Sequence, residues 1–425
     1  MKVKNLLLAG LAVAAMTACS NNDEFVDNSQ VLGAKDAFMQ FGITMPQGTK
    51  TRATGDKEAG TDAEQNFADI AIVIDYGSTK ELSIFPKVAF NEKTKGQLYL
   101  KESIPVQATA NGQTAKIYAF VNPDATLKGN LANAVNTYAA LKQGSNYDNT
   151  LDGLINGAAK ENNFLMTGIK AGAEFVKDET AIYTVEVDRV AAKLEERTSP
   201  EAAWIVTKDS EGNDLKNANG ENISLSISVS DYSFSNLQTE SYVLYNETPL
   251  SVAQFQPWAE ATKSYKFKKC ATVTEDVTGS ITYCYENATS ATTSAVYKAV
   301  AKVKVGETVQ EAANFFIAPD NTVFLSYTDL TATYKDLGLT EDATPEAYAA
   351  KGFMKYEDGV CYYKADIKTN TDVKIARNNV YKLTVTGIAK LGFATPGPKP
   401  KNTMLNLEVK IMEWTVNENN FNLGE

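Results

Sequence analysis

The residues that most often carry catalysis are sparse in this chain of 425 residues. It contains no histidine, which excludes serine–histidine and cysteine–histidine catalysis and histidine–zinc sites. Acidic pairs such as Glu195–Glu196 are typical of solvated surface, and no spacing places two carboxylates together for glycoside hydrolysis. The sequence therefore predicts no catalytic residue, no cofactor and a protein that is not an enzyme.

Two acidic loops resemble metal sites only superficially. The run from Asp209 to Asp214 has the acidic spacing of a calcium loop, but it lacks glycine at the sixth position and glutamate at the twelfth. The run from Asp148 to Gly153 has the composition of a turn. We therefore expect two turns here and no metal site.

Cys19 follows a segment with the features of an export signal. Lys2 and Lys4 form a basic start, residues 6–16 are apolar, and small residues lead to the cysteine. The apolar run is too short to span a bilayer as a mature helix. The pattern resembles a lipobox, which implies a signal peptide over residues 1–18 and a lipid on Cys19; the alternative is an ordinary signal peptide that ends near a cysteine.

Three further cysteines remain, namely Cys270, Cys284 and Cys361. Because their number is odd, at least one stays free or pairs between chains. Cys270 and Cys284 lie on neighbouring strand-like runs and could form a disulfide across a hairpin. The alternative is that all three are small buried hydrophobic residues.

The overall composition indicates a globular β protein. Hydrophobic residues make up 44% and charged residues 22% of the chain, and its length suits two domains, with three as the alternative. The formal net charge of −11 argues against nucleic acid as a partner, because phosphate backbones require a basic surface.

The stretch from Asp36 to Ala53 combines a strand with an exposed-looking basic site. Apolar residues alternate along its first part, which indicates one buried face, formed by Ala37, Met39, Phe41, Ile43 and Met45. Pro46 and Gly48 end the strand. A trypsin-like protease could cut after Arg52, although an ordinary loop arginine is the alternative.

Further strand patterns recur to the end of the chain, at residues 69–85, 115–121, 181–194, 223–229, 296–305, 322–334, 379–388 and 403–414. Helices are expected only at 131–141 and 344–351. Many short strands with few helices predict an all-β fold of two tandem β-sandwich (transthyretin-like) domains with a few short helices. We place the boundary in the polar run 195–200, which gives a lipidated propeptide with the first strand (19–52), an N-terminal domain (53–197) and a C-terminal domain (198–425).

The last strand has an apolar face formed by Leu405, Leu407, Val409 and Ile411. Periodicity cannot tell a strand that stays in its own domain from one that is donated to another molecule. Both interpretations therefore remain open from the residues alone.

The order of several motifs resembles the FimA/Mfa-like fimbrillins, subunits of type V pili in Gram-negative anaerobes. The motifs are the lipobox, the early strand with its Thr–Arg site, KIYAFVNP (116–123), NFLM (163–166), VDRVAAKL (187–194), YEN (285–287), GVCYY (359–363) and RNNVYKL (377–383). Each motif alone is weak, and the resemblance extends over nearly the whole chain.

The resemblance implies a lipoprotein precursor that is carried to the outer membrane and cut there by an arginine-specific protease between Arg52 and Ala53. The first strand would then leave, and the C-terminal strand of another copy would fill its place through Leu405, Leu407, Val409 and Ile411. The product would be an extracellular fimbrium on the cell surface that supports adhesion, with minor pilus subunits as further partners.

Strand addition supplies main-chain hydrogen bonds and alternate side-chain pockets, and head-to-tail donation grows an open filament. Three functions are compatible with an exported lipoprotein: a stalk subunit, a minor anchor or tip adhesin, and a surface enzyme. An anchor would keep its lipid and resist cleavage at Arg52, and a tip needs no strand to donate. Because the chain has both features, the sequence favours the stalk subunit.

Overall fold

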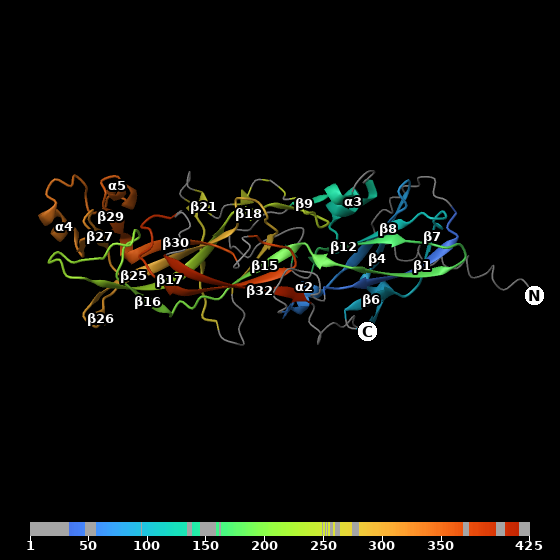
Figure 1. Cartoon of the computed structure of the whole chain (residues 1–425), viewed down its shortest axis with the longest axis horizontal. Coiled ribbons are helices and arrows are strands. Elements are labelled where there is room, and N and C mark those ends of the chain that lie inside the picture. The colour runs from blue at the N-terminus through green and yellow to red at the C-terminus, as the bar shows by residue number, and fades with distance from the viewer. Residues whose placement is uncertain are drawn as a thin grey trace, which may run out of the picture.

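Figure 1 shows the computed structural model of the chain, an elongated molecule built mainly of β-strands. The structure describes residues 34–46, 57–94, 96–133, 138–144, 159–160, 163–248, 250, 252, 254–255, 258–259, 264–273, 280–368, 374–396 and 404–415. No helix within these ranges is long and apolar enough to cross a membrane.

The N-terminal part is a sandwich of two five-stranded sheets around a common core. The first sheet contains β13 (Thr180–Glu186), β1 (Ala37–Thr44), β6 (Gln97–Leu100), β5 (Phe90–Thr94) and β7 (Ile104–Val106). The second contains β14 (Asp188–Arg189), β12 (Met166–Ala173), β8 (Ala115–Val121), β3 (Asp69–Asp75) and β4 (Lys80–Pro86). The strand pattern expected at 69–85 forms β3 and β4, which pair with each other.

The C-terminal part is a second sandwich. One sheet contains β2 (Lys57–Ala59), β32 (Leu405–Thr415), β31 (Asn379–Ile388), β15 (Ala191–Glu196) and β24 (Ser280–Tyr285). The facing sheet contains β16 (Ala203–Val206), β17 (Ser224–Ser235), β25 (Ser294–Val305), β26 (Thr308–Val309), β23 (Lys268–Lys269) and β30 (Val360–Asp366). The all-β fold with few short helices is thus confirmed.

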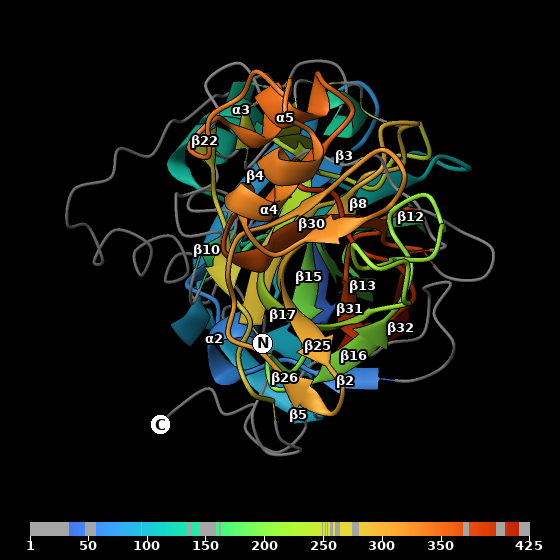
Figure 2. The ribbon, with the colours of Figure 1, turned by 90° about the vertical axis from the view of Figure 1, so that its left-hand side faces the viewer.

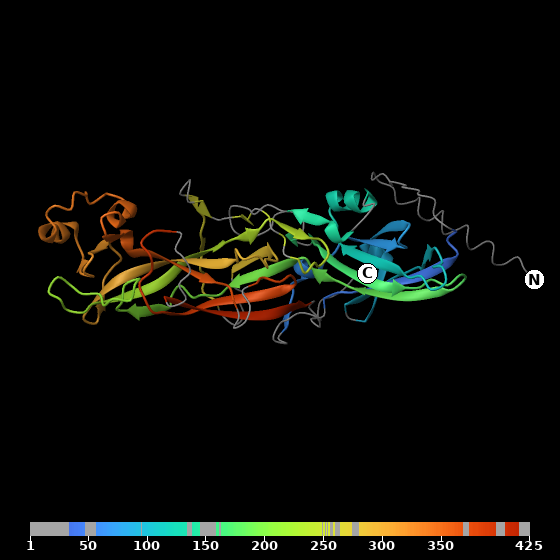
Figure 3. The same ribbon diagram turned by 45° about the horizontal axis from the view of Figure 1, so that its top comes forward.

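A small module closes the end of the molecule farthest from β1. It contains β27 (Phe315–Ile317), β28 (Val323–Phe324), β29 (Met354–Tyr356), α4 (Tyr327–Thr333) and α5 (Pro345–Ala349). Figure 2 looks along the long axis from this end, with α4 and α5 towards the viewer, and Figure 3 shows the module and the β1 sheet at opposite ends. The module has its own apolar cluster around Phe316, Leu330 and Tyr348.

The two sandwiches share one continuous apolar core. The chain crosses between them at Val190, because β14 pairs with β12 whereas β15 pairs with β24 and β31. β9 (Lys142–Gly144) also pairs across the junction with β19 (Glu240–Tyr242). The domain boundary after Arg197 stays a prediction, and β15 lies before it.

Three sequence expectations are wrong. The helix expected at 131–141 is instead α3 (Ala125–Asn133), which begins early because the Asp124 carboxylate accepts the Leu127 N–H at 2.7 Å. The strand expected at 322–334 ends at Phe324, and α4 follows with Ser326 as its N-cap. Glu195 and Glu196 are fully buried rather than solvated.

Shorter elements complete the described chain. The remaining paired strands are β10 (Ala159–Lys160) with β11 (Asn163–Phe164), β18 (Leu237–Gln238) with β20 (Gln254–Phe255), and β21 (Trp258–Ala259) with β22 (Ser264–Tyr265). The helix α2 (Asp62–Gln65) follows β2, and 3-10 turns lie at Lys87–Ala89, Tyr138–Ala140 and Glu357–Gly359. The helix expected near 344–351 is α5, with Thr344 as N-cap.

Candidate functional site

β1 is enclosed by strands on both sides. It pairs in parallel with β13 from Phe38 to Thr44 and antiparallel on its other edge, with β7 at its start and β6 at its end. We call the space between β13 on one side and β6 and β7 on the other the β1 slot. A strand in this slot forms main-chain hydrogen bonds along both edges, which is the geometry of strand addition.

The inward face of β1 is completely buried. Its side chains are Ala37, Met39, Phe41, Ile43 and Met45, each 0% exposed, as their alternation predicts. Burial of the four larger ones stabilises the folded chain by about 1.5–3 kcal/mol each. The apolar core therefore holds β1 firmly in its sheet.

The outward face of β1 is held by polar contacts at one position and covered by an aromatic ring at another. The Gln40 amide nitrogen donates to the Leu100 carbonyl at 2.5 Å, and the Ser103 hydroxyl donates to the Gln40 amide oxygen at 3.3 Å. Gly42 lies directly opposite Tyr99 of β6. Neighbouring residues therefore also contact the outward face of β1 at specific positions.

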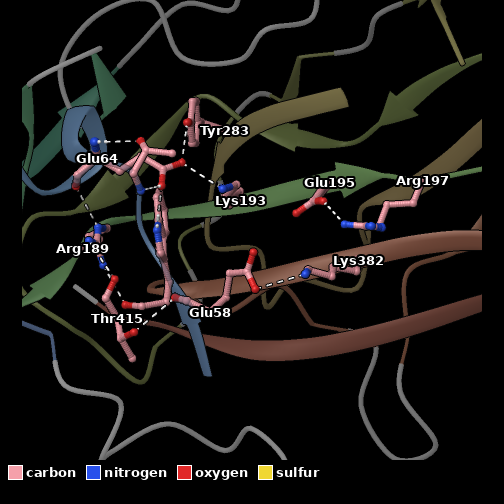
Figure 4. A network of polar contacts seen from close by, with 11 residues as sticks. Glu58, Glu64, Arg189, Lys193, Glu195, Arg197, Tyr283, Lys382 and Thr415 are labelled. Carbon is pink, nitrogen blue, oxygen red and sulfur yellow. Dashed lines mark hydrogen bonds and ion pairs between the residues drawn. The ribbon is translucent and has the colours of Figure 1, made fainter. Parts of the chain in front are cut away.

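A second constellation, shown in Figure 4, lies where the two sandwiches meet. Thr61 and Glu64 form a capping box around α2. The Glu64 carboxylate is 3.0 Å from the Lys193 ammonium, and it accepts hydrogen bonds from Tyr283 at 2.7 Å and from the Trp414 indole N–H at 3.3 Å. We call Glu64, Arg189, Lys193, Tyr283 and Trp414 the junction network.

The charge of Glu64 is kept in spite of its burial. Burial raises the pKa of a carboxyl group, but the Lys193 charge and the hydrogen bonds from Tyr283 and the Thr61 backbone outweigh this, so that the pKa of Glu64 lies below its usual value. The buried pair is therefore ionised and hydrogen-bonded, the condition under which a buried ion pair is tolerated.

Arg189 is fully buried and ties the end of β32 to α2. It donates to the carbonyls of Trp414 at 2.7 Å, Thr415 at 3.4 Å and Glu64 at 3.2 Å, and to the Asn378 side chain at 3.3 Å. Its guanidinium lies 4.4 Å from the Trp414 ring centre, a cation–π distance. Burial lowers the pKa of Arg189 to about 10, which leaves it charged at neutral pH.

The junction network holds the chain that follows the expected cleavage position. β2 pairs in parallel with Glu413–Thr415 of β32, the Glu58 carboxylate contacts Lys382 at 3.1 Å, and Thr415 donates to the Glu58 carbonyl at 3.3 Å. Residues 57–59 are therefore attached to the C-terminal sheet by contacts that do not involve β1.

The structure does not bring the first and last strands together within one chain. β32 pairs with β31 over Leu405–Glu413 in its own sheet, away from the β1 slot (Figure 1). Leu405 is buried, whereas Leu407, Val409 and Ile411 are partly buried and pack against the core. Cys19, Arg52 and Ala53 lie outside the described residues.

The remaining cysteines are free. Cys270, Cys284 and Cys361 are all buried and unpaired, so the expectation of a disulfide between Cys270 and Cys284 is wrong and the alternative of small buried residues is confirmed. Burial raises the pKa of the Cys361 thiol to about 12 and that of the other two thiols further. Such thiols are unreactive at neutral pH.

The acidic loop at Asp209 is a turn, as expected. Its carboxylate accepts the backbone N–H groups of Glu211, Gly212 and Asn213 at 2.7–2.9 Å. The described residues contain no group of three or more cysteine or acidic side chains placed to bind a metal ion. The loop at Asp148–Gly153 lies outside the described residues.

Sequence reasoning missed the junction network. Its members come from residues 64, 189, 193, 283 and 414, and their convergence depends on the fold. Two signals were available. Thr61–Glu64 has the spacing of a capping box, and Arg189 and Lys193 fall inside the VDRVAAKL motif.

Comparisons with known proteins agree with this architecture. Residues 354–420 match the family model "Major fimbrial subunit protein type IV, Fimbrillin, C-terminal". The fold matches a candidate cell adhesion protein from Parabacteroides distasonis at a TM-score of 0.50 and 13% identity, covering 90% of this chain and 98% of that chain. No curated protein matches the chain in sequence.

Two further structures resemble the chain more distantly. One is a candidate cell adhesion protein from Bacteroides eggerthii, with a TM-score of 0.48 and 14% identity over 92% of this chain and 99% of that chain. The other is a fimbrilin (FimA) from Porphyromonas gingivalis, with a TM-score of 0.47 and 14% identity over 90% of this chain and 99% of that chain.

Proposed function

We propose that this chain, whose residues 354–420 match the fimbrillin C-terminal family, is a structural stalk subunit of a cell-surface fimbria that supports adhesion. It would be exported as an outer-membrane lipoprotein with its lipid on Cys19. An arginine-specific protease would cut between Arg52 and Ala53, and a segment from another copy would replace β1. Partners are thus further copies of the chain, the protease and minor pilus subunits.

The observation that carries the proposal is the burial of β1 between neighbouring strands. Its inward face is fully buried, it has partner strands on both edges, and the segment containing Arg52 follows directly. Once that segment is cut, β1 is joined to the rest of the chain only by noncovalent contacts. A strand from another copy could then supply the same hydrogen bonds and apolar side chains.

The arginine content favours a single cut. The sequence has four arginines, and three lie within the folded molecule. Arg189 and Arg377 are 0% and 6% exposed, and Arg197 forms an ion pair with Glu195. The three arginines of the described chain are therefore poor protease sites, which leaves Arg52 as the proposed cut.

The donor is the C-terminal segment of another copy. It begins with Leu405, Leu407, Val409 and Ile411 and continues into the residues after Thr415. Because the donating and accepting surfaces differ, each added copy presents a new donor or acceptor, and the assembly grows as an open filament.

The test is cleavage of full-length protein at the cell surface. Arg52→Ala and Arg52→Lys should both leave a lipidated monomer and abolish the SDS-resistant ladder, whereas Lys50→Ala, the matched control, should leave the ladder unchanged. Mature fibres should begin at Ala53 on N-terminal sequencing. A ladder of normal length from Arg52→Ala, or native protein that stays monomeric and acylated ahead of residue 53, would contradict the proposal.

A further inference from the structure

A tyrosine side chain lies across the outer face of the β1 slot. Tyr99 of β6, Gly42 of β1 and Thr184 of β13 are direct neighbours in the strand register. The Thr184 hydroxyl donates to the Tyr99 hydroxyl oxygen at 3.3 Å, so the ring spans the glycine between them. The Lys93 ammonium lies 4.8 Å from the ring centre. We call Tyr99 in this position the tyrosine bar.

The tyrosine bar leaves no room for a side chain on the strand beneath it. A Cβ atom at position 42 would lie 2.6 and 2.8 Å from two carbons of the Tyr99 ring and 3.0 Å from the Thr184 hydroxyl oxygen. Any residue other than glycine must therefore shift the Tyr99 ring from the position in which it contacts Thr184 and Lys93. The slot thus requires glycine at one register position.

A second outward position has a defined chemistry. Two residues before the glycine, the Gln40 amide donates to the Leu100 carbonyl and accepts from the Ser103 hydroxyl. Met39 and Phe41 point inward on either side of it and are fully buried. Together, positions 39–42 require an apolar residue, an amide, an apolar residue and glycine.

We propose that the tyrosine bar selects the segment that replaces β1, and that this segment is Phe421–Gly424 of a second copy. Its sequence, Phe-Asn-Leu-Gly, has the same order of types as Met39–Gly42, Met-Gln-Phe-Gly. Gly424 is the one glycine in the sequence after β32. This inference rests on the proposed function and identifies the part of the donor that reaches the tyrosine bar.

The apolar run on β32 fits the slot less well. When its apolar residues point inward, the outward residues are Asn406, Glu408 and Lys410, so a long or branched side chain lies under Tyr99 in every register. That run also ends in Trp414 and Thr415, which Arg189 and β2 hold in their own sheet. Over positions 39–42 the tail after β32 matches the slot better than the β32 run does.

The selectivity can be tested in the intact chain, without cleavage. One variant, the tail graft, gives β1 the sequence of residues 421–424 through Met39→Phe, Gln40→Asn and Phe41→Leu. A second variant, the β32 graft, gives β1 the sequence of residues 407–410 through Met39→Leu, Gln40→Glu, Phe41→Val and Gly42→Lys. Its matched control has the first three substitutions and keeps Gly42. We expect the melting temperature of the β32 graft to lie about 3–10 °C below that of its control. The tail graft should have a higher melting temperature than the β32 graft. Adding Tyr99→Ala should reduce the difference in melting temperature between the β32 graft and its control.

Two melting results would overturn the selectivity: equal melting temperatures for the β32 graft and its control, or a gap that Tyr99→Ala leaves unchanged. Neither result depends on whether Arg52 is cut.

Assembly tests the identity of the donor. Gly424→Val should slow formation of the SDS-resistant ladder at least about tenfold, and adding Tyr99→Ala should restore it. Asn420→Val is the matched control, because Asn420 takes the register of Phe38, whose side chain is 43% exposed. Unchanged assembly of Gly424→Val overturns the assignment of Phe421–Gly424. If the wild type is cleaved at Arg52 but never assembles, the proposed function fails while the graft result still stands.

Discussion

β1 and β32 have the same alternating pattern but different surroundings. The inward face of β1 is fully buried, and strands pair along both of its edges. β32 pairs with β31 along its length, whereas β2, the described strand on its other edge, reaches only Glu413–Thr415. Alternation therefore identifies the apolar face of a strand, and the neighbouring strands decide how firmly that face is held.

β32 itself divides into two parts. From Leu407 to Ile411 its apolar residues are only partly buried, whereas Trp414 is fully buried and lies within the junction network. The strongest attachment of the C-terminal strand is therefore at its last residues. The following predictions test this contrast between the β1 slot, the middle of β32 and the junction network.

The largest effect is expected from Glu64→Gln. It leaves the Lys193 ammonium buried without its carboxylate, and we expect the free energy of unfolding to fall by about 3–5 kcal/mol in urea denaturation. Glu58→Gln, which breaks the more exposed pair with Lys382, should cost less than about 1 kcal/mol. Equal losses would show that the junction network is not the stronger attachment.

A pair of truncations compares the two strands directly. Phe41→Ala empties a fully buried position and should cost about 3–5 kcal/mol, whereas Val409→Ala, on the partly buried part of β32, should cost about 1 kcal/mol. Both values come from urea denaturation. If Val409→Ala lowers the free energy of unfolding as much as Phe41→Ala does, then β32 is held in its sheet as firmly as β1.

A change in pH should act on the β32 sheet through Glu196 of β15. Burial raises the pKa of this carboxyl group to about 7, although Thr198 donates to it. Between about pH 4.5 and 7 the folded chain keeps a proton that the unfolded chain releases. The free energy of unfolding should therefore fall by about 1–3 kcal/mol as the pH rises through this range.

Glu196→Gln should remove this part of the pH dependence and leave the stability below pH 4.5 nearly unchanged. The measurement is urea denaturation at a series of pH values. An identical slope in both proteins would contradict the assignment of the titration to Glu196.

Local patterns predicted much of the fold. The bounds expected for β8 and β31 match the structure, and β1 has the buried face that its alternation indicates. The helix expected at 131–141 begins instead at Ala125, because Asp124 caps its first turn ahead of the apolar spacing. A capping side chain, and not hydrophobic periodicity, decided where that helix begins.

The burial and partners of several charged residues could not be read from the sequence. Glu195 and Glu196 resemble surface residues, but Arg197 pairs with the first and Thr198 donates to the second in a buried setting. Glu64 and Trp414 are 350 positions apart, and the fold brings them together with β2 paired to the end of β32. The site at the junction is thus a product of topology.

The crossing of the chain at Val190 has a mechanical consequence. β13 forms one wall of the β1 slot, and the same run of backbone continues through β14 into β15 of the second sandwich. In a filament of the proposed kind, tension on a strand held against β13 would pass along peptide bonds into the next sheet. Each subunit would then act as a covalent tether between its neighbours, and the noncovalent strand in the slot would be the link that yields first.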